Sequence, residues 1–107
     1  MSIASDLIRG NTDTIILAQL AQENSYGYKI NKAIQQKTGN AYELKEATLY
    51  TAFRRLEETG CIRSYWGDET TGARRRYYEI TDHGRSELHR LKSEWESAKH
   101  LIDLLIE

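Results

Sequence analysis

The last quarter of the chain restricts the fold most strongly, because its apolar residues repeat with the period of a long helix that needs a partner. Between Thr81 and Ile106 the apolar spacing alternates between three and four, which is the a/d heptad pattern of a helix–helix seam. The seam consists of Leu88, Leu91, Trp95, Ala98, Ile102 and Leu105. Thr81 is a good N-cap for this helix. A single helix cannot bury such a seam, so we expect it to pack against another helix of the same domain or of a second chain.

Three shorter helices are predicted upstream, each with apolar residues at helical spacing. They cover Asp6–Gln22, Tyr26–Thr38 and Lys45–Thr59. The first has a broad apolar stripe of Leu7, Ile8, Ile15, Ile16, Leu17 and Leu20. The inward positions of the second are Tyr26, Ile30, Ala33 and Ile34, and the buried stripe of the third is Leu49, Ala52, Phe53 and Leu56. Gly10 and Asn11 interrupt the first stripe, which indicates that its first turns form a separate or frayed extension. Ser25 is the expected cap of the second helix. Gly39 and Gly60 are expected to end the second and third helices.

The hydrophobic period then changes from helical to alternating, which is typical of strands. Two short strands are expected at Ile62–Trp66 and Arg75–Ile80, joined by the turn-rich segment Gly67–Ala73 into a β-hairpin. The order of helix, helix, helix, hairpin and helix is that of a winged helix-turn-helix, a mostly α fold of the α+β class. Residues 1–80 would form a DNA-binding domain and residues 81–107 a long C-terminal dimerisation helix, together one structural unit.

The length and composition restrict where such a chain can work. A chain of 107 residues is one small domain, with little room for a large catalytic pocket in a single copy. The first residues lack the apolar core of a signal peptide, and no stretch is long and apolar enough to cross a membrane. The single cysteine, Cys61, cannot form an internal disulfide. We therefore expect a soluble protein of the cytoplasm with no membrane partner.

The residues that could carry enzyme or metal chemistry form no recognisable motif. His83, His89 and His100 lack the spacing of metal ligands, and Cys61 lies at a helix-to-strand junction, where a small buried side chain is expected. No segment resembles a nucleophile elbow or a glycine-rich phosphate loop. We expect no catalytic residue, no metal and no cofactor, and hence a protein that is not an enzyme.

The distribution of charge is more informative than its total, since the formal net charge is −1 at pH 7. The face of the third helix opposite Leu49 and Phe53 carries groups suited to DNA, because guanidiniums bind guanine or phosphate and hydroxyls reach phosphates. This face consists of Ala47, Thr48, Tyr50, Thr51, Arg54 and Arg55. Lys45 lies near the start of the helix, where a DNA phosphate could offset the unfavourable dipole. A solvated helix face carries similar residues, so the helix alone leaves both interpretations open.

Three consecutive arginines, Arg74, Arg75 and Arg76, lie at the start of the second strand. They repel one another in isolation and gain when phosphates lie opposite them. This arrangement favours a wing that binds the DNA backbone. The alternative is pairing with Asp68 and Glu69 across the turn.

Several short runs resemble the signature of the PadR family of winged-helix transcriptional regulators. The runs are Tyr26–Tyr28, Glu46–Tyr50, Arg55–Glu57, Gly60–Ile62, Ser64–Gly67, Gly72–Tyr78 and Ile80–Thr81. The similarity spans about Leu17 to Gly84, and the short C-terminal part, with Trp95 near the middle of one helix, is similar to the multidrug-sensing branch typified by LmrR. One departure is Lys45, which stands where the family commonly has a Ser, Thr or Asn cap on the recognition helix.

The resemblance implies a homodimer, formed by the last helix together with the first, that represses a nearby gene, often one for an efflux transporter. It also implies release of double-stranded DNA when a small planar aromatic effector binds between paired tryptophans of the two last helices. The matching residue is Trp95, and the other residues expected to line the space are Leu7, Thr14, Leu88, Leu91, Lys92, Ala98 and Lys99.

Two questions about this effector site stay open. Lys92 and Lys99 would favour an anionic or phenolic ligand, whereas Asp13 and Glu96 could reverse that preference. Trp95 could instead only fill the dimer core, and the regulator could act on its own gene without any drug ligand.

One alternative from another class is a winged-helix module that grips a partner protein rather than DNA. Such an interface would depend on Tyr50 and Trp66. DNA binding would depend on Arg74–Arg76 and would fall steeply with salt.

Overall fold

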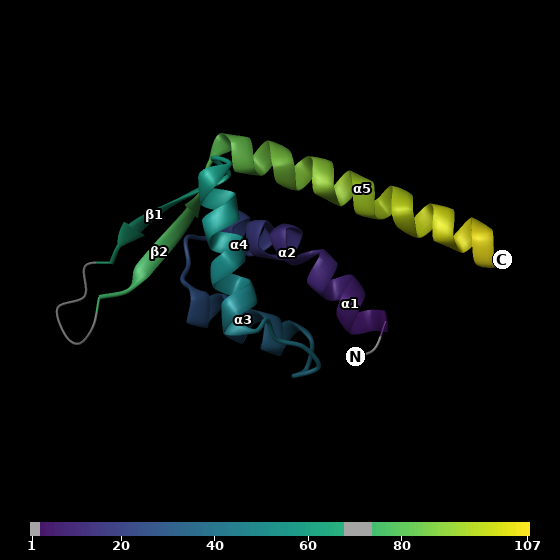
Figure 1. Cartoon of the computed structure of the whole chain (residues 1–107), viewed down its shortest axis with the longest axis horizontal. Coiled ribbons are helices and arrows are strands. Elements are labelled where there is room, and N and C mark those ends of the chain that lie inside the picture. The colour runs from purple at the N-terminus through teal and green to yellow at the C-terminus, as the bar shows by residue number, and fades with distance from the viewer. Residues whose placement is uncertain (1–2, 68–73) are drawn as a thin grey trace.

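The computed structural model describes residues 3–67 and 74–107 and contains the predicted order of helices and strands (Figure 1). The elements are α1 (Ile3–Gly10), α2 (Thr12–Gln22), α3 (Gly27–Lys37), α4 (Glu46–Glu58), β1 (Ile62–Trp66), β2 (Arg76–Ile80) and α5 (Asp82–Ile106). Within this part of the chain, no helix is long and apolar enough to cross a membrane. The fold is a winged helix-turn-helix with a long C-terminal helix, as the sequence predicts.

The first helical stripe is divided at the predicted place. α1 ends at Gly10, and α2 begins at Thr12. The Asn11 side chain donates to the carbonyl oxygen of Leu7 at 2.8 Å, and the Thr12 hydroxyl donates to the carbonyl oxygen of Arg9 at 2.6 Å. These local hydrogen bonds satisfy carbonyl groups at the end of α1, so the joint is a defined corner between two helices.

The start of α3 corrects one prediction, because Ser25 does not cap this helix. Tyr26 is the N-cap residue, and its side chain makes no capping hydrogen bond. Ser25 instead forms an isolated bridge to β2, in which its N–H donates to the Tyr78 carbonyl at 3.2 Å and its carbonyl accepts from Tyr78 N–H at 2.8 Å. The Ser25 backbone is therefore paired with β2, and its side chain does not cap α3.

α4 lies across the centre of the domain, and its predicted apolar stripe is buried. Leu49, Ala52, Phe53 and Leu56 all lie in one core with residues of α2, α3 and the hairpin. The Phe53 ring stacks on Tyr78 of β2 with ring centroids 3.9 Å apart. This packing fixes one side of α4 and leaves the opposite side at the surface.

The hairpin is an antiparallel pair whose register places Ile62 opposite Ile80 and Trp66 opposite Arg76. β2 begins one residue later than predicted, at Arg76. Beyond the strands, Gly67 N–H donates to the Arg75 carbonyl at 2.7 Å and continues the ladder toward the tip. Residues 68–73, which include Asp68 and Glu69 of the alternative pairing, lie outside the described residues.

α5 begins at the predicted cap. Thr81 Oγ1 accepts from Gly84 N–H at 3.0 Å and donates to the Gly60 carbonyl at 2.6 Å, which ties the cap to the end of the α4–β1 turn. Gly84 is buried against Cys61, just before β1, and Ile80 at the end of β2, and a Cβ there would lie 2.0 Å from the Cys61 carbonyl oxygen. The first turns of α5 therefore dock tightly on the domain.

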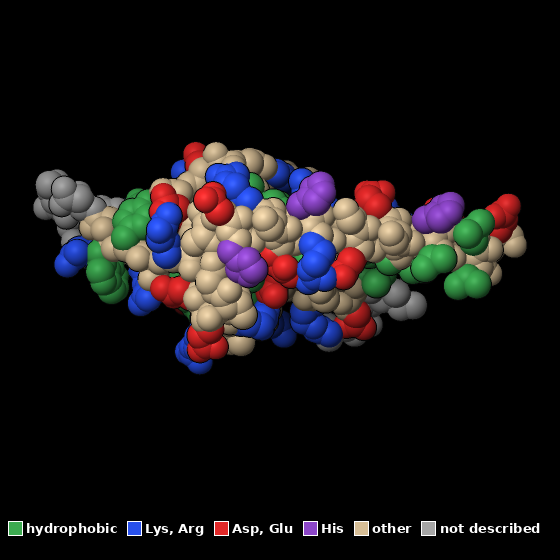
Figure 2. Space-filling model, turned by 90° about the horizontal axis from the view of Figure 1, so that it is seen from above, with side chains coloured by type: hydrophobic (Ala, Val, Ile, Leu, Met, Phe, Trp, Pro, Cys, Tyr) green, Lys and Arg blue, Asp and Glu red, His purple; other side chains and the backbone are tan. Residues whose placement is uncertain are grey.

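The seam of α5 changes from buried to exposed along the helix. Leu88 is buried and Leu91 packs against the core, but Ile102 is 47% exposed and Leu105 is 82% exposed. α5 contacts α2 and then continues past the body of the domain (Figure 1). Seen from above, apolar side chains gather at its free end (Figure 2). The C-terminal end of the predicted seam, with Ile102 and Leu105, is thus at the surface in one copy of the chain.

Candidate nucleic-acid interface

The start of α4 is anchored by a side chain of the preceding helix. Lys45 is the N-cap residue, and its side chain makes no capping hydrogen bond, as expected from its departure from the family pattern. Asn31 of α3 instead bonds both backbone groups of Leu44, donating to its carbonyl at 2.7 Å and accepting from its N–H at 2.8 Å. This contact could not be predicted from the sequence, since nothing in the local pattern indicates a pairing of Asn31 with Leu44.

The contact between α3 and α4 also explains why a glycine, Gly27, lies between Tyr26 and Tyr28. A Cβ on Gly27 would lie 3.0 Å from the Tyr50 hydroxyl and 3.2 Å from Leu49 Cδ2. The first turn of α3 therefore approaches α4 more closely than most side chains allow. This approach places Tyr50 beside the start of α3, at the surface of the molecule.

The predicted reading face of α4 points away from the core. All its members are exposed except Thr48, which is half-buried. A hollow of about 370 Å³ lies along one side of this face. It is lined by Arg9, Thr12, Ala47, Thr48, Thr51 and Arg55. Arg9 of α1 was not predicted, because only the corner between α1 and α2 brings it beside α4.

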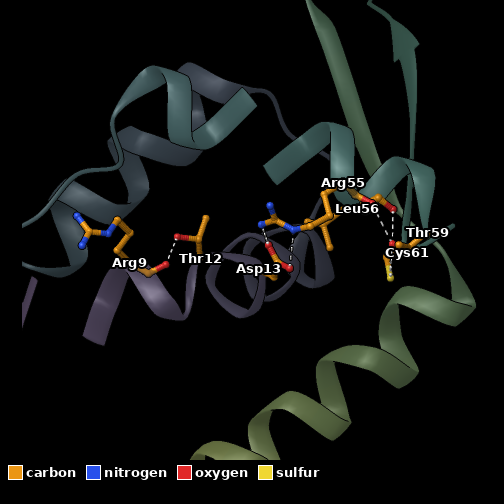
Figure 3. A network of polar contacts seen from close by, with 7 residues as sticks. All are labelled: Arg9, Thr12, Asp13, Arg55, Leu56, Thr59 and Cys61. Carbon is orange, nitrogen blue, oxygen red and sulfur yellow. Dashed lines mark hydrogen bonds and ion pairs between the residues drawn. The ribbon is translucent and has the colours of Figure 1, made fainter. Parts of the chain in front are cut away.

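Among the described residues, Arg55 is the one member of this face with an ion pair to another helix. Its Nε donates to Asp13 Oδ2 at 3.2 Å and its Nη2 donates to Asp13 Oδ1, so α4 and α2 are joined by a two-pronged ion pair (Figure 3). These hydrogen bonds raise the pKa of Arg55 above its usual value and keep it charged. The sequence places Arg55 on the outer face correctly but does not indicate Asp13 as its partner.

The three wing arginines are exposed and each lies over an aromatic ring. Arg74 lies 5.6 Å from the Trp66 ring centroid and Arg75 lies 4.9 Å from that of Tyr26. Arg76 donates to Ser64 Oγ at 2.8 Å and lies 3.5 Å from the Glu57 carboxylate. Arg76 is therefore partly neutralised within the domain.

A second hollow, of about 610 Å³, joins the wing to the two helices. It is lined by Tyr26, Gly27, Tyr28, Tyr50, Arg74, Arg75, Arg76 and Tyr78. The predicted wing arginines and Tyr50 thus meet around one concave surface of guanidiniums and tyrosines. Lys45 and Arg54 are exposed but line neither hollow.

A third feature is an apolar groove of about 770 Å³ between α1, α2 and α5. It is lined by Ala4, Leu7, Ile8, Asn11, Thr14, Ile15, Lys92, Trp95 and Glu96. Four residues of the predicted effector site therefore meet here, namely Leu7, Thr14, Lys92 and Trp95. Leu88 lies in the core and Lys99 pairs with Glu96 at 3.0 Å, and neither lines the groove.

Trp95 also borders a smaller cavity of about 370 Å³. Leu91 and Ala98 of the predicted set line this cavity, together with Asp13 and Arg55. The tryptophan of α5 and an arginine of α4 therefore share one cavity.

A helix-turn-helix whose outer helix and arginine-bearing hairpin lie side by side defines a winged-helix DNA-binding protein. The model of the transcriptional regulator PadR-like family matches residues 16–90, and the chain belongs to this family. It is therefore a DNA-binding transcriptional regulator and not an enzyme.

Proteins similar in sequence match this chain over almost its whole length. A transcriptional regulator structure from Clostridium thermocellum is 48% identical, with a TM-score of 0.89 over 99% of this chain and 100% of that chain. A PadR family regulator from Eggerthella lenta is 30% identical, with a TM-score of 0.87 over 98% of this chain and 89% of that chain. Uncharacterized protein X of Lysinibacillus sphaericus is 44% identical over 105 residues, which are 98% of this chain and 96% of the relative.

Proposed function

We propose that this regulator is a homodimeric repressor of the cytoplasm that releases its operator when a small planar aromatic effector binds. The observation that carries the proposal is the position of the Trp95 groove beside the exposed part of the α5 seam. An exposed apolar helix that borders an apolar groove is suited both to dimer formation and to binding of a ligand at the dimer interface.

The dimer is supported by the exposed apolar residues of α5. Leu101, Ile102, Leu104, Leu105 and Ile106 all lie at the surface of one copy. A second copy related by a two-fold axis would cover them with the same residues of its own α5 and with its α1. Burying this surface supplies the free energy for association.

The DNA contacts are assigned to α4 and the wing. Within this proposal, α4 enters the major groove with Thr48, Tyr50, Thr51, Arg54 and Arg55, and Lys45 lies near a phosphate. Arg74, Arg75 and Arg76 bind the backbone from the wing. The two hollows beside α4 support the assignment, because one is lined by Thr48, Thr51 and Arg55 together with Arg9, and the other by Tyr50 and the three wing arginines.

The effector is assigned to the groove at Trp95, whose side chain is 36% exposed in one copy. An exposed indole beside Leu7, Ile8 and Ile15 offers a flat apolar surface on which an aromatic ring can stack. Lys92 and Glu96 both line the groove, so flatness rather than charge is expected to select the ligand. The cavity that Trp95 shares with Arg55 offers a route from this groove to the reading helix.

Fluorescence tests the effector assignment. Trp66 is the other tryptophan, so the titration is made with a Trp66→Phe variant, in which Trp95 is the sole reporter. Flat aromatic dyes are expected to quench this fluorescence and to release operator DNA at the same concentrations. Quenching without release would contradict the regulatory role, and release that persists in Trp95→Ala would place the ligand elsewhere.

A further inference from the structure

The ion pair between Arg55 and Asp13 occupies only one edge of the guanidinium. Asp13 accepts from Nε and Nη2 of Arg55, so the edge formed by Nη1 and the outer N–H of Nη2 faces away from the carboxylate. Among the described residues, none accepts a hydrogen bond from Nη1. The same side chain lines the hollow along the reading face of α4, together with Thr48 and Thr51.

The pair fixes the direction of this free edge. An arginine on a helix surface normally samples many rotamers, but two hydrogen bonds tie Arg55 to a helix packed in the same core (Figure 3). Asp13 lies in the first turn of α2 and Arg55 in the last turn of α4. Each charge is therefore also favoured by the dipole of its own helix.

Pairing also changes what Arg55 can recognise. Asp13 balances the positive charge, which weakens the attraction to an anionic phosphate and adds a nearby carboxylate that repels one. The free N–H groups keep their direction and their capacity to donate. An uncharged pair of acceptors suits such a group better, and the O6 and N7 atoms of guanine are the pair that a guanidinium fork binds in the major groove.

We propose that Asp13 is a specificity-determining residue that acts through Arg55, orienting it to read one guanine in each half of the operator. The inference rests on the proposed function, because it requires α4 to lie in the major groove. Asp13 itself touches no DNA and acts as a positioning residue.

The test compares three full-length variants on an operator obtained by selection from random DNA, with every base pair then changed singly. Asp13→Asn removes the charge that holds Arg55. Arg55→Lys keeps the charge but loses the fork. Asp6→Asn is the matched control, since Asp6 pairs with Arg9 at 2.6 Å within α1.

The wild-type chain and the Asp6→Asn control are expected to prefer guanine at one position of each half-site by on the order of tenfold. Asp13→Asn and Arg55→Lys should both lose that preference at that position and keep the others. Asp13→Asn should also bind random DNA more tightly and with a steeper salt dependence, because Arg55 is then free to bind phosphate.

Two results would overturn the inference alone. One is an unchanged guanine preference in Asp13→Asn, and the other is a loss spread evenly over all positions together with a lower melting temperature. A wild-type chain that binds every sequence equally would overturn both this inference and the operator binding on which it rests.

Discussion

At the scale of single residues, α4, the proposed DNA-reading helix, is positioned by a side chain that binds backbone. Asn31 satisfies both the N–H and the carbonyl of Leu44, just before α4 begins. Leu44 is itself buried in the core, so its backbone groups would otherwise lack water as a partner. One amide side chain therefore anchors the backbone just before the N-cap residue Lys45, which makes no capping hydrogen bond itself.

Replacing Asn31 with alanine is expected to lower the free energy of unfolding by about 1–3 kcal/mol, because two buried backbone groups lose their partner. Urea denaturation measures the change. Gln35→Ala is the matched control, since the Gln35 side chain donates only to the exposed Glu43 carboxylate, at 2.6 Å. Equal losses in the two variants would contradict the role given to Asn31.

The wing arginines are predicted to contribute to DNA binding electrostatically. Arg75 lies at the surface of the wing, over the Tyr26 ring. Arg75→Ala should reduce the slope of log affinity against log salt by about one for each protomer, because one phosphate contact is lost. Identical slopes in the wild type and Arg75→Ala would mean that the wing does not touch phosphate.

At the scale of elements, the docking of α5 depends on the close approach of Gly84 to the Cys61 backbone, just before β1. A Cβ at position 84 would overlap the Cys61 carbonyl carbon and oxygen, which are backbone atoms that cannot move aside independently. The same first turn is held by the Thr81 cap. The direction in which α5 leaves the domain is therefore set by one tight contact and one capping residue.

Gly84→Ala is expected to destabilise the fold by at least about 1–3 kcal/mol, the usual cost of forcing extra volume into a packed site. Thermal unfolding measures it as a lower melting temperature. Gly10→Ala serves as the control, because a Cβ at position 10 would meet nothing within 4 Å. A Gly84→Ala variant as stable as the Gly10→Ala variant would contradict this packing.

The elements themselves were predictable because their signals are local. The a/d spacing, the Thr81 cap and the change of period at Ile62 all lie within a few residues of what they determine. The errors and omissions concern contacts between distant segments, such as the Ser25 bridge to Tyr78 and the Asp13 pair with Arg55. No period or cap signal encodes such pairs, since only the packing of α2, α4 and the hairpin brings them together.

At the scale of the whole molecule, one copy of the chain leaves an apolar helix end at its surface. The domain has a continuous core, but α5 extends from it with apolar side chains at the surface (Figure 2). The Trp95 groove opens beside this helix. Within the proposed dimer, the groove would be closed by the second copy, so assembly and effector binding would depend on the same surface.

Ile102→Glu is expected to shift the protein from dimer to monomer without unfolding it, because Ile102 lies on the free part of the seam. Leu91 is a poorer choice, since it also packs against the core. Sedimentation velocity measures the change, and circular dichroism checks the fold. His100→Glu is the control, with the same added carboxylate on the opposite side of α5. A dimer that survives Ile102→Glu would contradict the interface.

The measurement that tests the central claim most directly is binding of the wild-type chain to the DNA just upstream of its own gene, at several salt concentrations. A dimeric repressor should bind one site there as two copies, more tightly than random DNA, and with an affinity that falls steeply as salt rises. Binding no tighter than to random DNA, or binding by a single copy, would contradict the claim.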